Sequence, residues 1–169
     1  GIGPAKLNDV EYYALRGSLV VDLSDDIENY TIVSYLNSDH IGTQPQLYRG
    51  NPFTSFGNLA LPQINRMKAS SDPYQVETTL SNPQSITKQF QAINTTTWQV
   101  SDTLTLKNIL SYATFRQGLR QSVFGSNFQL PVATFGVPVY LSTAQAFNVD
   151  GTWGNNQNTF VEEFQVQMK

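Results

Sequence analysis

Few side chains in this sequence could carry out chemistry, and the only histidine is the first to consider. His40 follows Asp39 at the start of a stretch rich in Pro, Gly, Asn and Gln. An imidazole can serve as a general base or a metal ligand. A lone histidine at the start of a loop is more often a surface or loop-packing residue, and that is our interpretation of His40.

The carboxylates do not form a catalytic pair or a metal loop either. Glu162 and Glu163 are adjacent, so on a strand they point to opposite faces and cannot act together. Asp25 and Asp26 are typical turn formers, and the twelve-residue ligand spacing of a calcium loop is missing around them. No G-x-S-x-G motif and no phosphate-binding glycine loop is present. We therefore expect no enzyme, no catalytic residue, no metal and no cofactor.

Composition narrows the class of protein further. Charged residues are 14% of the 169 residues, against about 25% in a typical soluble domain. A net charge of -3 with scattered Lys and Arg argues against a nucleic-acid partner. Cysteine is absent, so disulfides and thiolate chemistry are excluded. No apolar run is long enough for a membrane helix, but barrel strands give a weaker, alternating signal over about 10 residues.

The elements that would position these residues are strands. In the second half of the hairpin at 89–115, Leu104, Leu106, Leu110 and Tyr112 share one parity while Thr105, Lys107 and Ser111 share the other. This period of two is typical of a sheet with unlike faces. A second hairpin at 12–37 repeats the first at an offset of 77 residues, so we expect both turns at the same edge of one sheet.

The predicted fold is all-β, an antiparallel meander of about five strands joined alternately by short turns and long connections. The strands are expected at about 12–23, 28–37, 89–100, 104–115 and 159–168, and the long loops at about 38–86 and 118–158. A short helical turn is possible at 59–69, interrupted early by Pro62. Long connections at one end and short turns at the other are the rule in outer-membrane barrels.

The strand and turn residues also resemble a known family. Three segments carry the likeness: Arg16 to Leu19 with Asp25 and Tyr35, INTTTWQVSDTLTLKNILSY from Ile93 to Tyr112, and FVEEFQVQ from Phe160 to Gln167. Together they resemble the β-barrel of TonB-dependent outer-membrane receptors. The likeness covers about half of the chain, and the long loops match nothing in that family.

The resemblance implies a transmembrane barrel of about 22 strands, of which this chain would supply part. No plug domain and no aromatic C-terminal residue are found, so the remaining strands and the plug are expected as partners, from the same protein or from other chains. An open sheet with bare edges cannot sit in lipid. The implied function is energised uptake, with the TonB complex acting through the plug, of a scarce bulky solute such as a metal chelate, vitamin or glycan. The implied location is the cell outer membrane of a Gram-negative bacterium, with outer-membrane lipid as a further partner.

The alternation assigns faces within such a barrel. A lysine on the lipid side at the bilayer midplane costs about 2–4 kcal/mol, so Lys107 should point into the lumen and the leucines of its strand toward lipid. By the repeat, Leu19, Val21 and Leu23 face lipid and Arg16 faces the lumen, whereas strand 28–37 has no clear facing. Trp98 would lie in the periplasmic aromatic girdle or, as an alternative, in an ordinary core.

The aromatic residues of the long loops are the candidate capture surface, although no individual binding residue can be assigned. They could stack on a solute, or they could pack the loops against each other. In loop 118–158 they are Phe124, Phe128, Phe135, Tyr140, Phe147 and Trp153. The main alternative for the whole chain is a soluble secreted all-β binding module of the carbohydrate-binding or adhesin type. A β-rich hydrolase is a weaker third interpretation.

Overall fold

The chain is mostly β in the computed structural model, which describes residues 9–130, 136–137, 139–141, 144–147 and 153–169. Five long strands carry the fold: β1 (Tyr12–Ser24), β2 (Ile27–His40), β3 (Gln84–Ser101), β4 (Leu104–Ser122) and β8 (Asn155–Met168). The remaining elements are one helix, α1 (Ser55–Ala69), and three short strands: β5 (Phe128–Leu130), β6 (Val139–Leu141) and β7 (Ala144–Phe147).

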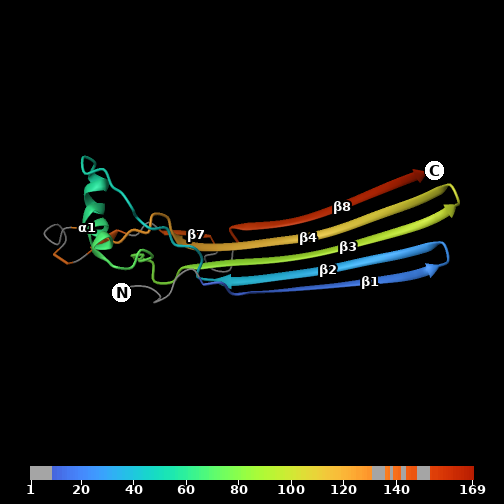
Figure 1. The fold of residues 1–169 in the computed structure, drawn as a ribbon, viewed down its shortest axis with the longest axis horizontal. Coiled ribbons are helices and arrows are strands. Elements are labelled where there is room, and N and C mark those ends of the chain that lie inside the picture. The colour runs from blue at the N-terminus through green and yellow to red at the C-terminus, as the bar shows by residue number, and fades with distance from the viewer. Residues whose placement is uncertain (1–8, 131–135, 138, 142–143, 148–152) are drawn as a thin grey trace. The chain divides into compact units, whose positions relative to one another are not determined.

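The long strands form an antiparallel sheet in the order β1-β2-β3-β4-β8, side by side in Figure 1. On the side of β4 away from β3, β8 pairs with residues 104–117, and β7 pairs with residues 119–122. The five predicted strands are therefore confirmed. Among the described residues β1 and β8 each pair with one neighbour, so this sheet is open.

Both short turns lie at the same edge of the sheet, as the repeat predicted. Residues 25–26 join β1 to β2, and residues 102–103 join β3 to β4. The backbone N–H of Gln99 donates to the carbonyl of Asp26 at 2.8 Å, which links the first turn to the end of β3. Lys169 N–H donates to Thr103 O at 3.0 Å, so the end of β8 also lies at this edge.

Contacts divide the chain into two compact units, which we name the sheet unit and the loop unit. The sheet unit comprises Glu11–Asp39, Ile86–Gln117 and Trp153–Lys169. The loop unit comprises Gly1–Val10, His40–Ser85 and Gly118–Thr152. Most of both predicted long loops therefore falls in one unit.

Three strands run further than their sequence pattern indicated. β2 ends at His40, β3 begins at Gln84 and β4 ends at Ser122. Ladder hydrogen bonds join backbone groups, so pairing continues through segments whose side chains no longer alternate. The predicted boundaries at 37, 89 and 115 were wrong for this reason.

Helix α1 corrects the prediction of a short turn at 59–69. The Thr54 hydroxyl caps the helix by accepting from Gly57 N–H at 3.0 Å, so the helix begins four residues earlier. Pro62 lies inside and removes one backbone donor. The helix tolerates this because one face is anchored by packing. The buried residues of that face are Gly57, Ala60, Gln63, Ile64 and Met67.

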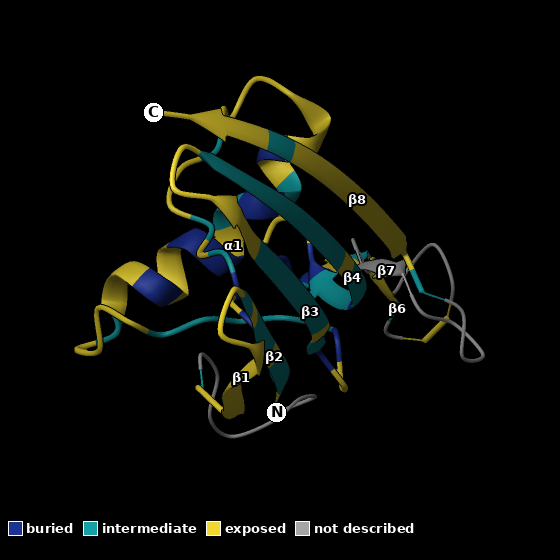
Figure 2. Cartoon of the chain, turned by 90° about the vertical axis from the view of Figure 1, so that its right-hand side faces the viewer, coloured by how far each residue is buried: buried dark blue, intermediate teal, exposed yellow. Residues whose placement is uncertain are grey.

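The loop unit has a hydrophobic core, built from both long connections. Ala60 and Ile64 of α1 pack with Phe128 of β5, which is fully buried, and Leu47 and Leu59 border them. The Phe56 ring meets Phe128 edge-on, with ring centroids 5.0 Å apart. In Figure 2, dark blue marks the buried residues of α1, whereas the only buried residues of the five long strands are Gly118 and Ser122 near the end of β4.

Gly125 permits the two connections to approach closely. Its φ of +59° is a backbone conformation that favours glycine. A Cβ at this position would collide with the carbonyl oxygen of Pro45, which belongs to the other long connection. Any side chain at residue 125 would push the two segments apart.

Candidate functional site

The sheet unit has one apolar face and one polar face, and its hydrogen bonds establish which residues share each. Leu15, Leu19 and Val21 of β1 lie opposite Tyr35, Thr31 and Asn29 of β2. The Asn29 amide donates to Thr96 Oγ1 of β3 at 2.8 Å, so the even-numbered residues of β3 lie on this face. This result assigns a facing to strand β2, which the sequence pattern left open.

The face of β4 follows from one further hydrogen bond. The Thr105 hydroxyl donates to Gln99 Oε1 at 2.8 Å, which puts odd-numbered residues of β4 with odd-numbered residues of β3. Leu104, Leu106, Leu110 and Tyr112 therefore lie on the face of Leu19, and Lys107 lies on the opposite face. The sequence predicted this same division.

The apolar face is large and uncovered. Leu15, Leu19, Phe160 and Phe164 are between 62% and 66% exposed. Further exposed apolar side chains on the same face are Tyr13, Val21, Val33, Trp98, Tyr112, Val166 and Met168. The hydrophobic core among the described residues lies wholly in the loop unit. Apolar side chains thus cover most of this side of the sheet, which also carries Glu162 opposite Leu110, and no layer of the described residues packs on them.

A polar patch interrupts the apolar face. Asn29 and Asn94 donate amide hydrogens to each other's carbonyl oxygens at 3.1 and 2.9 Å. Asn94 also donates to Thr31 Oγ1 at 2.7 Å, and Asn29 donates to Thr96. Because these four side chains satisfy one another, they lie on an apolar surface at little cost in unmade hydrogen bonds.

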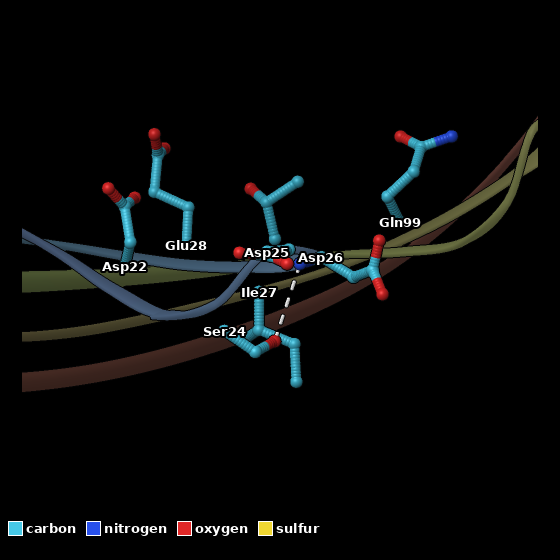
Figure 3. A pocket seen from close by; sticks show the side chains of 8 residues that line it. Asp22, Ser24, Asp25, Asp26, Ile27, Glu28 and Gln99 are labelled. Carbon is cyan, nitrogen blue, oxygen red and sulfur yellow. Dashed lines mark hydrogen bonds between the residues drawn. The ribbon is translucent and has the colours of Figure 1, made fainter.

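The polar face carries a hollow of about 610 Å³ beside the first turn (Figure 3). Asp22, Glu28 and Gln99 project to the same side there, and Ile27 projects to the other. Asp25 and Asp26 form the turn itself, as predicted, and Asp26 N–H donates to Ser24 Oγ. Nowhere in the described chain do three or more His, Cys, Asp or Glu side chains gather in a way that could hold a metal ion.

The other candidate residues have structural roles. His40 is the last residue of β2 rather than a loop residue, and its Nδ1 accepts from Gly42 N–H at 2.9 Å. Glu162 accepts from Asn108 and Glu163 accepts from Gln165, so the two carboxylates do face opposite ways.

The aromatic residues of the predicted capture loop divide into two groups. Phe128 is a core residue, and Phe124 contacts the Phe56 ring at 5.9 Å between centroids. Tyr140 is half-exposed, and Lys88 Nζ lies 5.7 Å from the ring centroid of Trp153 in the sheet unit. Phe135 and the Phe147 side chain lie outside the described residues. The other long connection carries exposed rings that the sequence did not single out: Tyr48, Phe53 and Tyr74.

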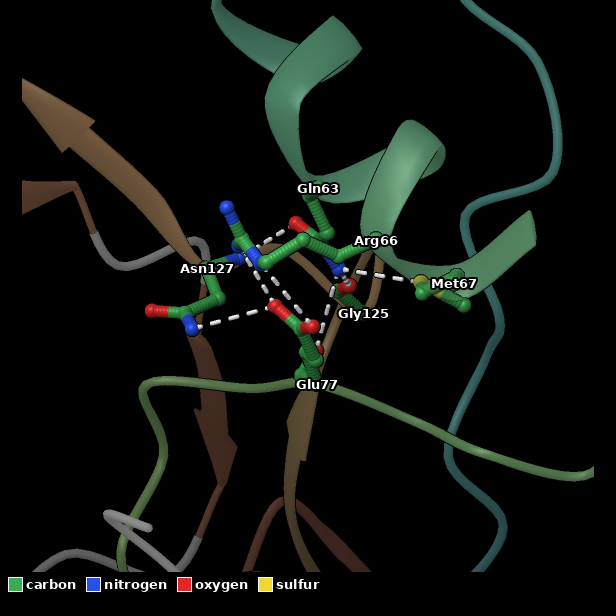
Figure 4. Close-up of polar contacts among 6 residues, drawn as sticks. All are labelled: Gln63, Arg66, Met67, Glu77, Gly125 and Asn127. Carbon is green, nitrogen blue, oxygen red and sulfur yellow. Dashed lines mark hydrogen bonds and ion pairs between the residues drawn. The ribbon is translucent and has the colours of Figure 1, made fainter. Parts of the chain in front are cut away.

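A buried amide network joins the two long connections (Figure 4). Gln63 is 1% exposed, donates to Gly125 O at 2.6 Å and accepts from Asn127 N–H at 2.7 Å. Asn127 donates to Glu77 Oε2, which also forms an ion pair with Arg66 at 2.7 Å. This hydrogen-bonded contact with Glu77 raises the pKa of Arg66. These contacts hold loop residues from both connections in one arrangement.

Sequence reasoning missed this network. The one available signal was an amide at residue 63, in the same helical stripe as Ala60, Ile64 and Met67. A polar residue within an apolar stripe indicates a buried partner. Its partners, Gly125 and Asn127, are too distant in the chain for any local pattern to reveal.

Comparison with protein-family models, with curated proteins and with solved structures finds no match to this chain. Among the described residues, no helix is long and apolar enough to cross a membrane.

Proposed function

We propose that this chain is a segment of an outer-membrane active transporter of a Gram-negative bacterium, in which the five long strands are part of a closed barrel of about 22 strands. The transporter captures a scarce bulky solute and imports it with energy supplied through TonB. The remaining barrel strands would pair with the free edges of β1 and β8, because unpaired backbone groups are costly in lipid.

The observation that carries the proposal is the uncovered apolar face. Proteins in water rarely expose contiguous apolar patches larger than a few hundred Å². Such a patch extends over both edge strands of the sheet unit, with Leu15 and Leu19 on β1 and Phe160 and Phe164 on β8. Acyl chains would cover these side chains, and the opposite face, with Asp22, Glu28 and Lys107, would line water.

The dimensions of this face fit a bilayer. Trp98 and Lys88 lie on it ten residues apart on β3. Ten strand residues span about 33 Å, and a strand tilt of about 40° reduces this to about 25 Å, the height of the apolar band on outer-membrane barrels. An aromatic ring thus stands near one boundary and a cation near the other.

The loop unit supports a role in capture. Its core and the Gln63 network preorganise the long connections, and a surface that is ordered in advance loses less entropy on binding. Exposed rings at Tyr48, Phe53 and Tyr74 offer stacking surfaces for a solute.

Cysteine labelling tests the proposal, because the chain has no native cysteine. The matched pairs L19C with S18C and L110C with S111C each sample neighbouring residues on opposite faces. In isolated outer membranes, we expect a small water-soluble maleimide to label S18C and S111C, and to label L19C and L110C only after detergent and urea denature the protein. The protein itself should require detergent for extraction.

Two results would overturn the proposal. Recovery of the protein in the soluble fraction would favour the secreted binding module. Equal labelling within each pair in intact membranes would mean that the leucine face does not meet acyl chains.

A further inference from the structure

Two basic side chains stand on the apolar face at the end of the strands away from the short turns. Gln99 and Thr105 are hydrogen-bonded neighbours on β3 and β4. Counting eleven residues away from the turn along each antiparallel strand leads to Lys88 and Arg116. Because eleven is odd, both lie on the face opposite to Gln99, which is the apolar face.

One aromatic ring lies close to the lysine. Lys88 Nζ lies 5.7 Å from the centroid of the Trp153 ring, within the range of a cation–π interaction. Tyr13 of β1 lies on the same face, and its ring centroid is 6.0 Å from that of Tyr35. Amphipathic rings of this kind concentrate at the headgroup level of membranes.

The arginine is oriented by its own strands. Arg116 Nη1 donates to the carbonyls of Phe115 and Gln157, and Nη2 donates to Asn158 Oδ1 at 2.9 Å. All three acceptors are uncharged. Neither Lys88 nor Arg116 forms a salt bridge with a carboxylate of the described residues.

Two cations without carboxylate partners on an apolar face point to an anionic occupant. We propose that Lys88 and Arg116 bind a phosphate group of a membrane lipid whose acyl chains lie along the apolar face, with Trp153 and Tyr13 at the headgroup level. The guanidinium supplies directed N–H donors and the ammonium supplies a point charge. This inference rests on the proposed function, because it needs the apolar face to lie in a bilayer.

Native mass spectrometry of the detergent-purified protein tests the site. The probes are diphosphorylated lipid A, the same lipid enzymatically freed of phosphate, and inorganic phosphate alone. The variants are K88Q, R116Q, their double variant and, as the matched control, K107Q, a lysine of β4 on the polar face. A cation near a membrane surface contributes about fivefold to anionic lipid affinity, so two contribute about 25-fold.

The expected result is a preference of about 25-fold for the phosphorylated over the dephosphorylated lipid, reduced about fivefold by each single variant and abolished by the double variant. K107Q should keep the full preference, and inorganic phosphate should remain unbound because it has no acyl chains.

The failure of this inference is distinguishable from that of the transporter proposal. A protein that needs detergent for extraction but binds both lipids equally, or loses the preference in K107Q as much as in K88Q, has no phosphate site at Lys88 and Arg116. Binding of inorganic phosphate with the same dependence on Lys88 would make the site one for free anions instead. A protein found in the soluble fraction would overturn the transporter proposal as well.

Discussion

The sheet unit and the loop unit differ in whether their apolar side chains are buried within the unit. In the loop unit, Phe128, Ile64 and Ala60 come from distant segments and pack against each other, out of contact with water. In the sheet unit, Phe164 and Phe160 stand nearly two-thirds exposed on a regular antiparallel ladder. The loop unit therefore contains its own core, whereas the apolar face of the sheet unit needs its surroundings to provide one.

The polar side chains of the two units differ in the same way. Gln63 is buried and binds backbone groups of another segment, so its removal orphans partners that water cannot reach. Asn29 and Asn94 are partly exposed and bind each other across adjacent strands. The polar network of the loop unit therefore joins distant segments of the chain, whereas that of the sheet unit joins only adjacent strands.

Truncating one phenylalanine in each unit gives the largest expected contrast. F128A should destabilise the loop unit by about 3–5 kcal/mol, because it empties the centre of the core. F164A, on the exposed face, should change stability in detergent by less than about 1 kcal/mol. Native-state hydrogen exchange of α1 measures the loss, and equal effects of the two variants would contradict a core confined to the loop unit.

A charge placed on the sheet tests whether its surroundings are lipid. Leu19 lies opposite Thr31, which hydrogen-bonds Asn94, about midway between Trp98 and Lys88 along β3. L19K should therefore reduce the stability of the folded protein in vesicles by about 2–4 kcal/mol. S18K, the neighbouring residue on the polar face, should cost little. Urea titration of refolding into vesicles measures both. Similar losses would mean that the two faces meet similar environments.

The difference between the units also explains what the sequence could predict. Alternation of Leu104, Leu106 and Leu110 against Thr105 and Lys107 is a local signal, so the strands, the turns and the faces of β1 and β4 were predictable. The boundaries of β3 and β4 were not, because backbone pairing continues beyond the alternating residues. No local sequence pattern indicates that residues 63 and 125 will be in contact. The core and the amide network of the loop unit therefore could not be predicted from the sequence.

The basic pair was hidden for a related reason. Lys88 and Arg116 are ordinary surface residues in sequence, and only the pairing of β3 with β4 brings them to one level. The prediction that loop aromatics are either stacking surfaces or packing residues was correct for Phe128 as packing, and it stays a prediction for the exposed rings.

Replacing the buried amide of Gln63 tests the loop unit further, with a smaller expected loss of stability. Q63L keeps the side-chain volume but leaves Gly125 O and Asn127 N–H without their partner, so the loop unit should lose about 2–3 kcal/mol. The matched control is N65L, an exposed amide two residues along the same helix, which should be nearly neutral. Limited proteolysis of the long connections is the measurement. If N65L increased proteolysis of the long connections as much as Q63L, the network would not be what holds these connections together.

The smallest effect belongs to the polar patch of the sheet unit. N29A and N94A each remove hydrogen bonds between β2 and β3, and each should cost about 1 kcal/mol, since side-chain hydrogen bonds within membranes are worth about that much on average. The double variant should cost less than the sum of the two by about 0.5–1 kcal/mol, because the second substitution removes a partner already lost. The control pair is S18A and S34A, polar-face serines that do not pair with each other, and these should be additive. Additive losses for Asn29 and Asn94 would mean that the two amides stabilise the sheet independently of each other, and the patch would then not be a self-satisfied part of the apolar face.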